Sequence, residues 1–220
     1  MARPRTTLLS RDIIGRAAIE FVDAGKDLQV VPLAKHLGVS VSSLYHHVDG
    51  RDGIIRAMRH SLVSQYVREP VADPDWQSTI RREVEHTWRM YAEHPRVLEL
   101  MVTVVIDEPD VLRIYSVLAE ALERAGLPDD EIITTIEVID AFSFGAALDA
   151  LSPDTILDAD RTEGRLARLL AGHPVGSVRN RAVFDRGLDL MLAGIAARAQ
   201  GFRPCAHARE AGLPASRQAG

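Results

Sequence analysis

Residues 33–45 read LAKHLGVSVSSLY and carry the strongest local signal for the fold of this chain. The apolar residues before Gly38 recur with the spacing of one helix face, so they predict a short first helix. Gly38 stands where that helix ends, because glycine adopts a positive φ without steric cost. Ser40 is suited to cap a second helix over 41–47. Two short helices joined by a tight turn form a helix-turn-helix, whose second helix enters the major groove of DNA.

A wider set of residues around this turn resembles the DNA-binding signature of TetR-family repressors. The matching residues are Leu33-Ala34, Leu37-Gly38-Val39-Ser40, Leu44-Tyr45-His46-His47-Val48, Arg51 and Ile54-Ile55. The tail of the motif and the helix after it make this resemblance more specific than a helix-turn-helix match alone. The alternative is an ordinary helical corner in a bundle. The resemblance implies a DNA-binding head at the N-terminus.

Composition narrows the class of protein. The chain has 220 residues, of which 46% are hydrophobic and 26% charged, as in soluble globular proteins. A single cysteine, Cys205, excludes an intramolecular disulfide and a cysteine-rich zinc site. We find no run of apolar residues long enough to span a membrane and no secretory leader. These features predict a cytoplasmic protein without a membrane partner.

Charge is distributed unevenly along the chain. Residues 1–60 carry nine Lys and Arg against six Asp and Glu, whereas the remaining 160 carry 17 against 25. The head is therefore net basic, and the body is net acidic. This pattern fits DNA binding by the head and self-association or ligand binding by the body.

We predict an all-α fold, with an N-terminal three-helix helix-turn-helix domain and a larger C-terminal helical domain for ligand binding and dimerisation. Apolar residues recur with helical spacing along the chain, and no strand pattern occurs. Residues 1–68 form the arm and DNA-binding domain, 69–200 the effector-binding and dimerisation domain, and 201–220 a disordered tail. The helices expected in the body are 75–94, 96–106, 109–125, 128–151, 165–171 and 181–200, with a mobile loop over 173–180.

The body also resembles that of the tetracycline repressor and its relatives. The resemblance rests on Asp75-Trp76-Gln77, Phe142-Ser143-Phe144-Gly145, Phe184, Gly187-Leu188-Asp189-Leu190 and Gly194. It implies a homodimer in which the long apolar helix and the last helix pair with their copies in a four-helix bundle. The alternative is that both apolar faces are covered within one chain. The interface candidates are Phe144, Gly145, Leu148, Phe184, Gly187, Leu188, Met191 and Gly194.

A dimer would place two recognition helices about 34–36 Å apart, so we expect a near-palindromic operator on double-stranded DNA. Serine and tyrosine hydroxyls, the histidine ring and arginine side chains can form hydrogen bonds with phosphates and base edges. Arg3 and Arg5 belong to a basic arm that could equally be a frayed terminus. The predicted DNA contacts are Arg3, Arg5, Gln29, Val30, Val41, Ser42, Ser43, Tyr45, His46 and Arg51.

The resemblance further implies a small-molecule effector pocket among the middle helices. The candidates are Glu83, Thr87, Trp88, Met90, Tyr91, Met101, Val105, Val117, Ile139 and Phe142, although most of them would suit a plain core. Met101 stands where the tetracycline repressor has a magnesium-binding histidine. We therefore expect no metal and no cofactor. The mixture of Met, Trp and aliphatic side chains favours a moderately apolar ligand.

The resemblance therefore predicts a ligand-responsive transcriptional regulator, a repressor that binds a palindromic operator as a homodimer and is released by a small-molecule effector. An enzyme is not expected, because no phosphate loop, nucleophile elbow or His-Glu-x-x-His motif occurs. A helical adaptor or an activator with the same DNA-binding head remains an alternative. Ligand binding is expected to act by shifting populations between two conformations of the body.

Overall fold

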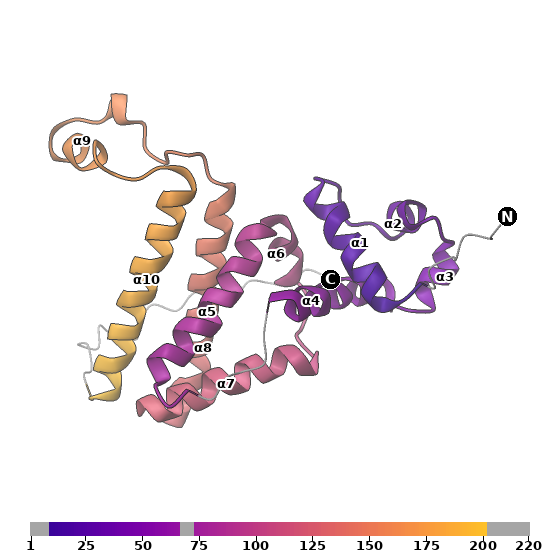
Figure 1. Ribbon diagram of the computed structural model, residues 1–220, viewed down its shortest axis with the longest axis horizontal. Helices are drawn as coiled ribbons and strands as arrows, with labels where there is room; N and C mark the ends of the chain where they lie inside the picture. The colour runs from indigo at the N-terminus through magenta and orange to yellow at the C-terminus, as the bar shows by residue number, and fades with distance from the viewer. Residues whose placement is uncertain (1–8, 67–72, 202–220) are drawn as a thin grey trace, which may run out of the picture.

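Helices account for all regular structure in the computed structural model, which describes residues 9–66 and 73–201 (Figure 1). This part of the chain contains ten α-helices, two short 3-10 helices and no strand. The α-helices are α1 Arg11–Asp23, α2 Val30–Leu37, α3 Val41–Tyr45, α4 Gly50–Tyr66, α5 Trp76–Glu93, α6 Pro95–Met101, α7 Pro109–Ala125, α8 Asp129–Leu148, α9 Gly164–Leu170 and α10 Gly176–Ala199. The predicted all-α class with an N-terminal helix-turn-helix is confirmed.

The helix-turn-helix forms where local signals place it. Gly38 ends α2 in the left-handed region, with φ of 68°. Ser40 begins α3, and its Oγ accepts a hydrogen bond from the backbone N–H of Ser43 at 3.0 Å. Leu33 and Leu44 are fully buried and belong to the same hydrophobic core as the buried residues of α1 and α4. The predicted recognition helix over 41–47 is shorter than expected, because a turn begins after Tyr45.

The close packing of α1 on α4 makes the head one unit. Gly15 of α1 lies against α4, and a Cβ at this position would be 2.3 Å from the backbone oxygen of Ala57. Only a residue without a side chain allows the two helices to come this close. Helix α4 therefore moves together with α1, and it continues from the head toward the body (Figure 1).

The body is built around α5, which packs against α7 and α8, and α10 packs against α8. Trp88 of α5 stacks on Phe184 of α10 with ring centroids 4.3 Å apart, and Phe142 of α8 stacks on the same ring at 5.8 Å. Aromatic burial of this kind is a large part of the apolar stabilisation of a helical layer. Figure 1 shows α9 at the upper left, apart from the bundle and beyond the end of α10.

Two helix boundaries in the body differ by about one and a half helical turns from the sequence prediction. Helix α6 ends at Met101 and not at 106, because Arg59 of α4 donates to the carbonyls of Met101 and Val104, which terminate the helical pattern. Helix α10 begins at Gly176, within the loop predicted over 173–180. Its first turn is held by Arg179, which is buried and bonds Asp149. The predicted tail, 202–220, lies outside the described residues.

Candidate functional site

Four of the predicted DNA contacts are exposed on α3 or within a few residues after it. Ser42, Tyr45 and His46 are exposed, and Tyr45 exposes 50% of its surface. Arg51 is exposed in the first turn of α4, directly after the turn that follows α3. Because buried Leu44 fixes the inner face of α3, these side chains share a direction away from the core. Such a surface can contact base edges and phosphates.

The remaining predicted DNA contacts differ from these in exposure or in their hydrogen bonds, or lie outside the described residues. Gln29 occupies the N-cap position of α2 and is exposed, whereas Val30 and Val41 are half-buried against the core of the head. The hydroxyl of Ser43 lies 2.8 Å from that of Ser40, so it takes part in the cap of α3. Arg3 and Arg5 lie outside the described residues. These positions stay predictions.

A cavity of about 480 Å³ lies in the body, between α4, α5, α7, α8 and the loop that joins α6 to α7. A volume of this size suits a small organic molecule. Its lining is mainly aliphatic and aromatic, and includes Val63, Thr87, Met90, Tyr91, Met101, Val102, Thr103, Val104, Val105, Ile106, Val111, Ile114, Tyr115, Leu118 and Phe144, together with Arg59 and Asp140. Val102 and Val105 are exposed, so the connecting loop forms its rim.

The structure brings together half of the predicted pocket residues. Thr87, Met90, Tyr91, Met101 and Val105 line this cavity. Glu83, Trp88, Val117, Ile139 and Phe142 do not line it. Glu83 accepts a hydrogen bond from Arg82 Nε at 2.9 Å, and Trp88 faces α10 and donates to the carbonyl of Ala146 at 3.4 Å. Ile139 is buried core, and Phe142 packs against Phe184, whereas Val117 is half-buried on α7.

One polar pair in the cavity was not predicted. The hydroxyl of Tyr115 donates to Asp140 Oδ2 at 2.8 Å. Burial raises the pKa of Asp140, and nearby Glu137 adds to the rise, whereas the hydrogen bond from Tyr115 opposes it. Burial and the charge of Asp140 also raise the pKa of Tyr115, and burial raises that of Tyr91 to about 12. Two acidic residues, Glu137 and Asp140, interrupt the apolar run of α8, and this interruption was the signal in the sequence.

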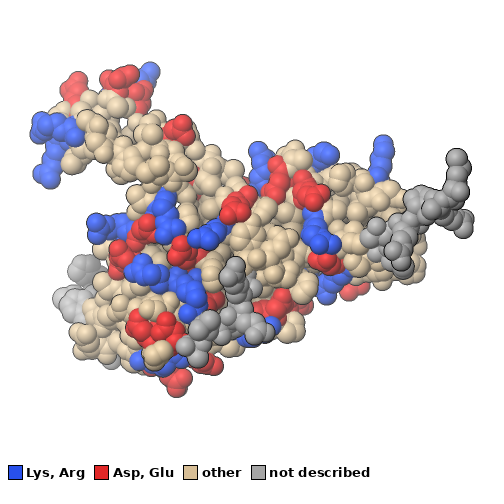
Figure 2. All heavy atoms as spheres, viewed as in Figure 1, with Lys and Arg blue, Asp and Glu red and all other residues tan. Residues whose placement is uncertain are grey.

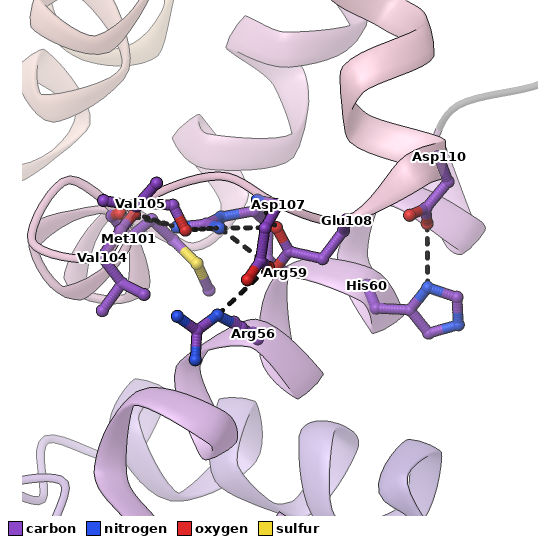
Figure 3. A network of polar contacts seen from close by, with 9 residues as sticks. All are labelled: Arg56, Arg59, His60, Met101, Val104, Val105, Asp107, Glu108 and Asp110. Carbon is purple, nitrogen blue, oxygen red and sulfur yellow. Dashed lines mark hydrogen bonds and ion pairs between the residues drawn. The ribbon is translucent and has the colours of Figure 1, made fainter. Parts of the chain in front are cut away.

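Helix α4 is fastened to the rim of the cavity by Arg59, which is 2% exposed (Figure 3). Arg59 Nη1 donates to both carboxylate oxygens of Glu108, at 3.0 and 2.8 Å. Its Nη2 donates to the carbonyls of Met101 and Val104, at 2.9 and 2.7 Å. We call Arg59, Glu108 and the carbonyl groups that Arg59 contacts the α4 clamp. It joins the helix that follows the recognition helix to the loop that borders the cavity.

Two further contacts flank the α4 clamp. Arg56 Nε lies 3.1 Å from Asp107 Oδ1, and His60 Nδ1 lies 2.8 Å from Asp110 Oδ2 (Figure 3). Asp107 is more than half exposed, so water screens this ion pair more than the buried one. Three successive polar contacts thus run from α4 to the start of α7.

The predicted dimer residues fall on two sides of the α8–α10 layer. Phe184 and Leu188 are buried within the chain, and Gly187 gives room to Phe142, whose ring would be 2.2 Å from a Cβ at this position. Phe144 lines the cavity, and Met191 is half-buried. Gly145, Leu148 and Gly194 are exposed. Among the described residues, an apolar and exposed set comprises Val138, Ala141, Gly145 and Leu148 of α8 with Val183, Leu190 and Gly194 of α10, and we call it the α8–α10 face.

Acidic and basic side chains are intermixed over the surface of the body that Figure 2 shows. Ion pairs between Arg81 and Asp189, at 2.6 Å, and between Arg181 and Glu85, at 2.9 Å, join α5 to α10. Within the described ranges, no helix is long and apolar enough to cross a membrane. The same ranges hold no group of His, Cys, Asp and Glu that could bind a metal ion.

Comparisons with known proteins agree with this arrangement. A family model described as the tetracyclin repressor-like C-terminal domain matches residues 69–199. An HTH-type transcriptional regulator from Saccharopolyspora erythraea is 28% identical over 206 residues, which cover 87% of this chain and 86% of that protein. The HTH-type transcriptional repressor DrrR1 from Streptomyces coeruleorubidus is 26% identical over 152 residues, which cover 66% of this chain and 54% of that protein.

The fold also matches a solved structure. Apo ActR from Streptomyces coelicolor superposes with a TM-score of 0.75 at 21% identity, over 89% of this chain and 99% of that chain. ActR is a TetR family protein that has also been solved in complex with actinorhodin.

Proposed function

Because this chain belongs to the tetracycline repressor-like family of transcriptional regulators, we propose that it is a repressor that a small-molecule effector releases from a palindromic operator. Members of this family are regulators and not enzymes. The observation that carries the proposal is the α4 clamp, since it connects the rim of a ligand-sized cavity to the helix behind α3. We place the protein in the cytoplasm, with 1–68 as the DNA-binding part and 69–200 as the effector-binding and dimerisation part.

Release would work by a shift of populations. A ligand in the cavity touches the residues of the α6–α7 loop, whose carbonyl groups bind Arg59. If the ligand binds one position of this loop better than the other, α4 and the head attached to it take up the corresponding position. The spacing between the two heads of a dimer then changes, and the operator no longer fits both.

The experiment that tests the regulator itself is a selection of DNA sequences on the purified full chain at physiological salt. An enriched palindrome is expected, because two identical heads read two half-sites. Binding that is weak and equal for all sequences would contradict the proposal and favour the helical adaptor. Transcription from the selected operator with and without the protein then separates repression from activation.

Substitution of exposed residues near α3 should lower operator affinity without changing the fold. Tyr45→Ala and Arg51→Ala each remove a side chain that faces away from the core. We expect each to weaken binding roughly tenfold, since a hydrogen bond to a phosphate is a charge-assisted contact. Fluorescence anisotropy on the selected operator measures the loss, and circular dichroism checks helicity. Arg168→Ala, on exposed α9, is the control and should bind normally.

We propose that the uncovered α8–α10 face binds a second copy of this chain. Val138 exposes 53% and Leu190 65% of its surface, and the glycines Gly145 and Gly194 allow two helix backbones to approach each other. A patch of this kind is unusual on a monomeric soluble protein. Two helices from each copy would form a four-helix bundle.

A charged side chain introduced on the α8–α10 face should prevent dimerisation. Leu190→Glu places a carboxylate in the proposed apolar interface, and the symmetry of a dimer puts two of them there, so each would be buried without a cation. We expect sedimentation equilibrium to give the mass of a dimer for the wild type and of a monomer for Leu190→Glu. Leu112→Glu, on the exposed side of α7, is the matched control and should remain dimeric. A wild-type monomer at micromolar concentration would contradict the proposed interface.

A further inference from the structure

Only two charged side chains line the cavity among the described residues, and they differ in what surrounds them. Arg59 is saturated, because Glu108 and the carbonyl groups of the α4 clamp take its Nη groups. Asp140 has one hydrogen bond, from Tyr115, and forms no ion pair within the described ranges. The cavity therefore presents one carboxylate that forms no ion pair with any cation among the described residues.

The surroundings of Asp140 raise the free energy of its ionised form. The walls of the cavity are apolar and include Met90, Ile114, Leu118 and Phe144. A carboxylate that is partly removed from water loses hydration, and one hydrogen bond replaces only part of it. Burial accordingly raises the pKa of Asp140. Glu137, three residues earlier on α8, adds negative charge and not positive charge.

We propose that the effector is a lipophilic amine, whose protonated nitrogen pairs with Asp140 while its apolar body fills the cavity. An ammonium group supplies both the missing charge and further hydrogen-bond donors, and such charge-assisted bonds are stronger than neutral ones. A carboxylate of the same shape meets repulsion, and a neutral alcohol gains only an ordinary hydrogen bond. Tyr115 acts as a positioning residue, because its hydroxyl holds one oxygen of Asp140. This inference rests on the proposed role of the cavity as the effector site.

The test uses three probes of one shape: biphenyl-4-methylamine, biphenyl-4-methanol and biphenyl-4-carboxylate. Isothermal titration of the full chain at neutral pH gives the three affinities. We expect the amine to bind at least roughly tenfold more tightly than the alcohol, in line with the added strength of a charge-assisted contact. We expect the carboxylate to bind most weakly. Equal affinity of amine and alcohol, tighter binding of the carboxylate, or no binding of the amine overturns the proposal.

Variants separate the role of Asp140 from a general preference for cations. Asp140→Asn keeps the shape and removes the charge, so the affinity for the amine should fall roughly tenfold or more, and that for the alcohol should change little. Glu137→Gln is the matched control, because it removes one negative charge from the same helix at an exposed position that does not line the cavity. An equal loss in both variants overturns the assignment to Asp140. The comparison of probes on the wild type stands even if Asp140→Asn does not fold.

Operator release is measured separately, by anisotropy on the selected operator with the amine present. If the amine prefers wild-type protein over Asp140→Asn but leaves operator affinity unchanged, the proposed function fails and the pairing holds. If the operator is released equally by the amine and the alcohol, with equal affinities, the pairing fails and the proposed function holds.

Discussion

Arg59→Met is expected to lower the free energy of unfolding by about 3–5 kcal/mol, the range measured when one member of a buried ion pair is removed. Glu108 is only 5% exposed, so its carboxylate would remain buried without a cation. The carbonyls of Met101 and Val104 would lose their donor at the same time. For a protein of this length, such a change lowers the melting temperature by roughly 10 °C. Thermal unfolding followed by circular dichroism measures it.

The matched control for this result is Arg56→Met. Arg56 stands one turn earlier on α4, and its partner Asp107 is 58% exposed, so the loss should stay below about 1 kcal/mol. The double variant Arg59→Met with Glu108→Leu should recover part of the lost stability, because it removes both buried charges. Equal stability of Arg59→Met and wild type would show that the α4 clamp does not hold the loop.

Gly15→Val is expected to lower the free energy of unfolding by roughly 3 kcal/mol, at the upper end of the cost of overpacking. Even the first carbon of the new side chain would be 2.3 Å from the oxygen of Ala57 and 2.5 Å from Ser61 Oγ. The oxygen belongs to the backbone of α4, so α1 and α4 must move apart. Chemical denaturation in urea measures the change.

Glu20→Val is the control for the packing of α1 on α4. It introduces the same side chain at an exposed position of α1. There we expect the free energy of unfolding to fall by only about 0.5 kcal/mol, because valine has a weaker helix propensity than most residues. If both variants lost the same stability, helix propensity and not the close approach of α1 and α4 would be the cause.

The DNA-binding head is the part of the molecule that sequence reasoning anticipated most fully. Gly38 adopts the positive φ that its place in the motif demands, and Ser40 accepts the capping hydrogen bond. Both are interactions between residues a few positions apart, so a local sequence can encode them. The sequence prediction misplaced the C-terminal end of α6 and the start of α10. Their determinants, Arg59 and Arg179, act on residues more than 20 positions away.

The candidate cavity was anticipated as a region but not as a set of residues. Helix α8 is apolar on nearly all sides, so its periodicity does not say which side faces the cavity, the core or a second copy. Phe144 was expected at a dimer interface and lines the cavity, whereas Phe142 was expected in the pocket and packs on Phe184.

The all-helical class, the helix-turn-helix and the exposed outer face of α3 follow from the sequence alone, because turns, caps and amphipathic stripes depend on neighbours along one helix. That Asp140 and Tyr115 share the cavity, and that Arg59 joins α4 to its rim, depends on the tertiary structure. These contacts link residues 25 and 45 positions apart, from helix to helix in one case and from helix to loop in the other. Their geometry follows from how the helices pack, which no pattern along a single helix contains.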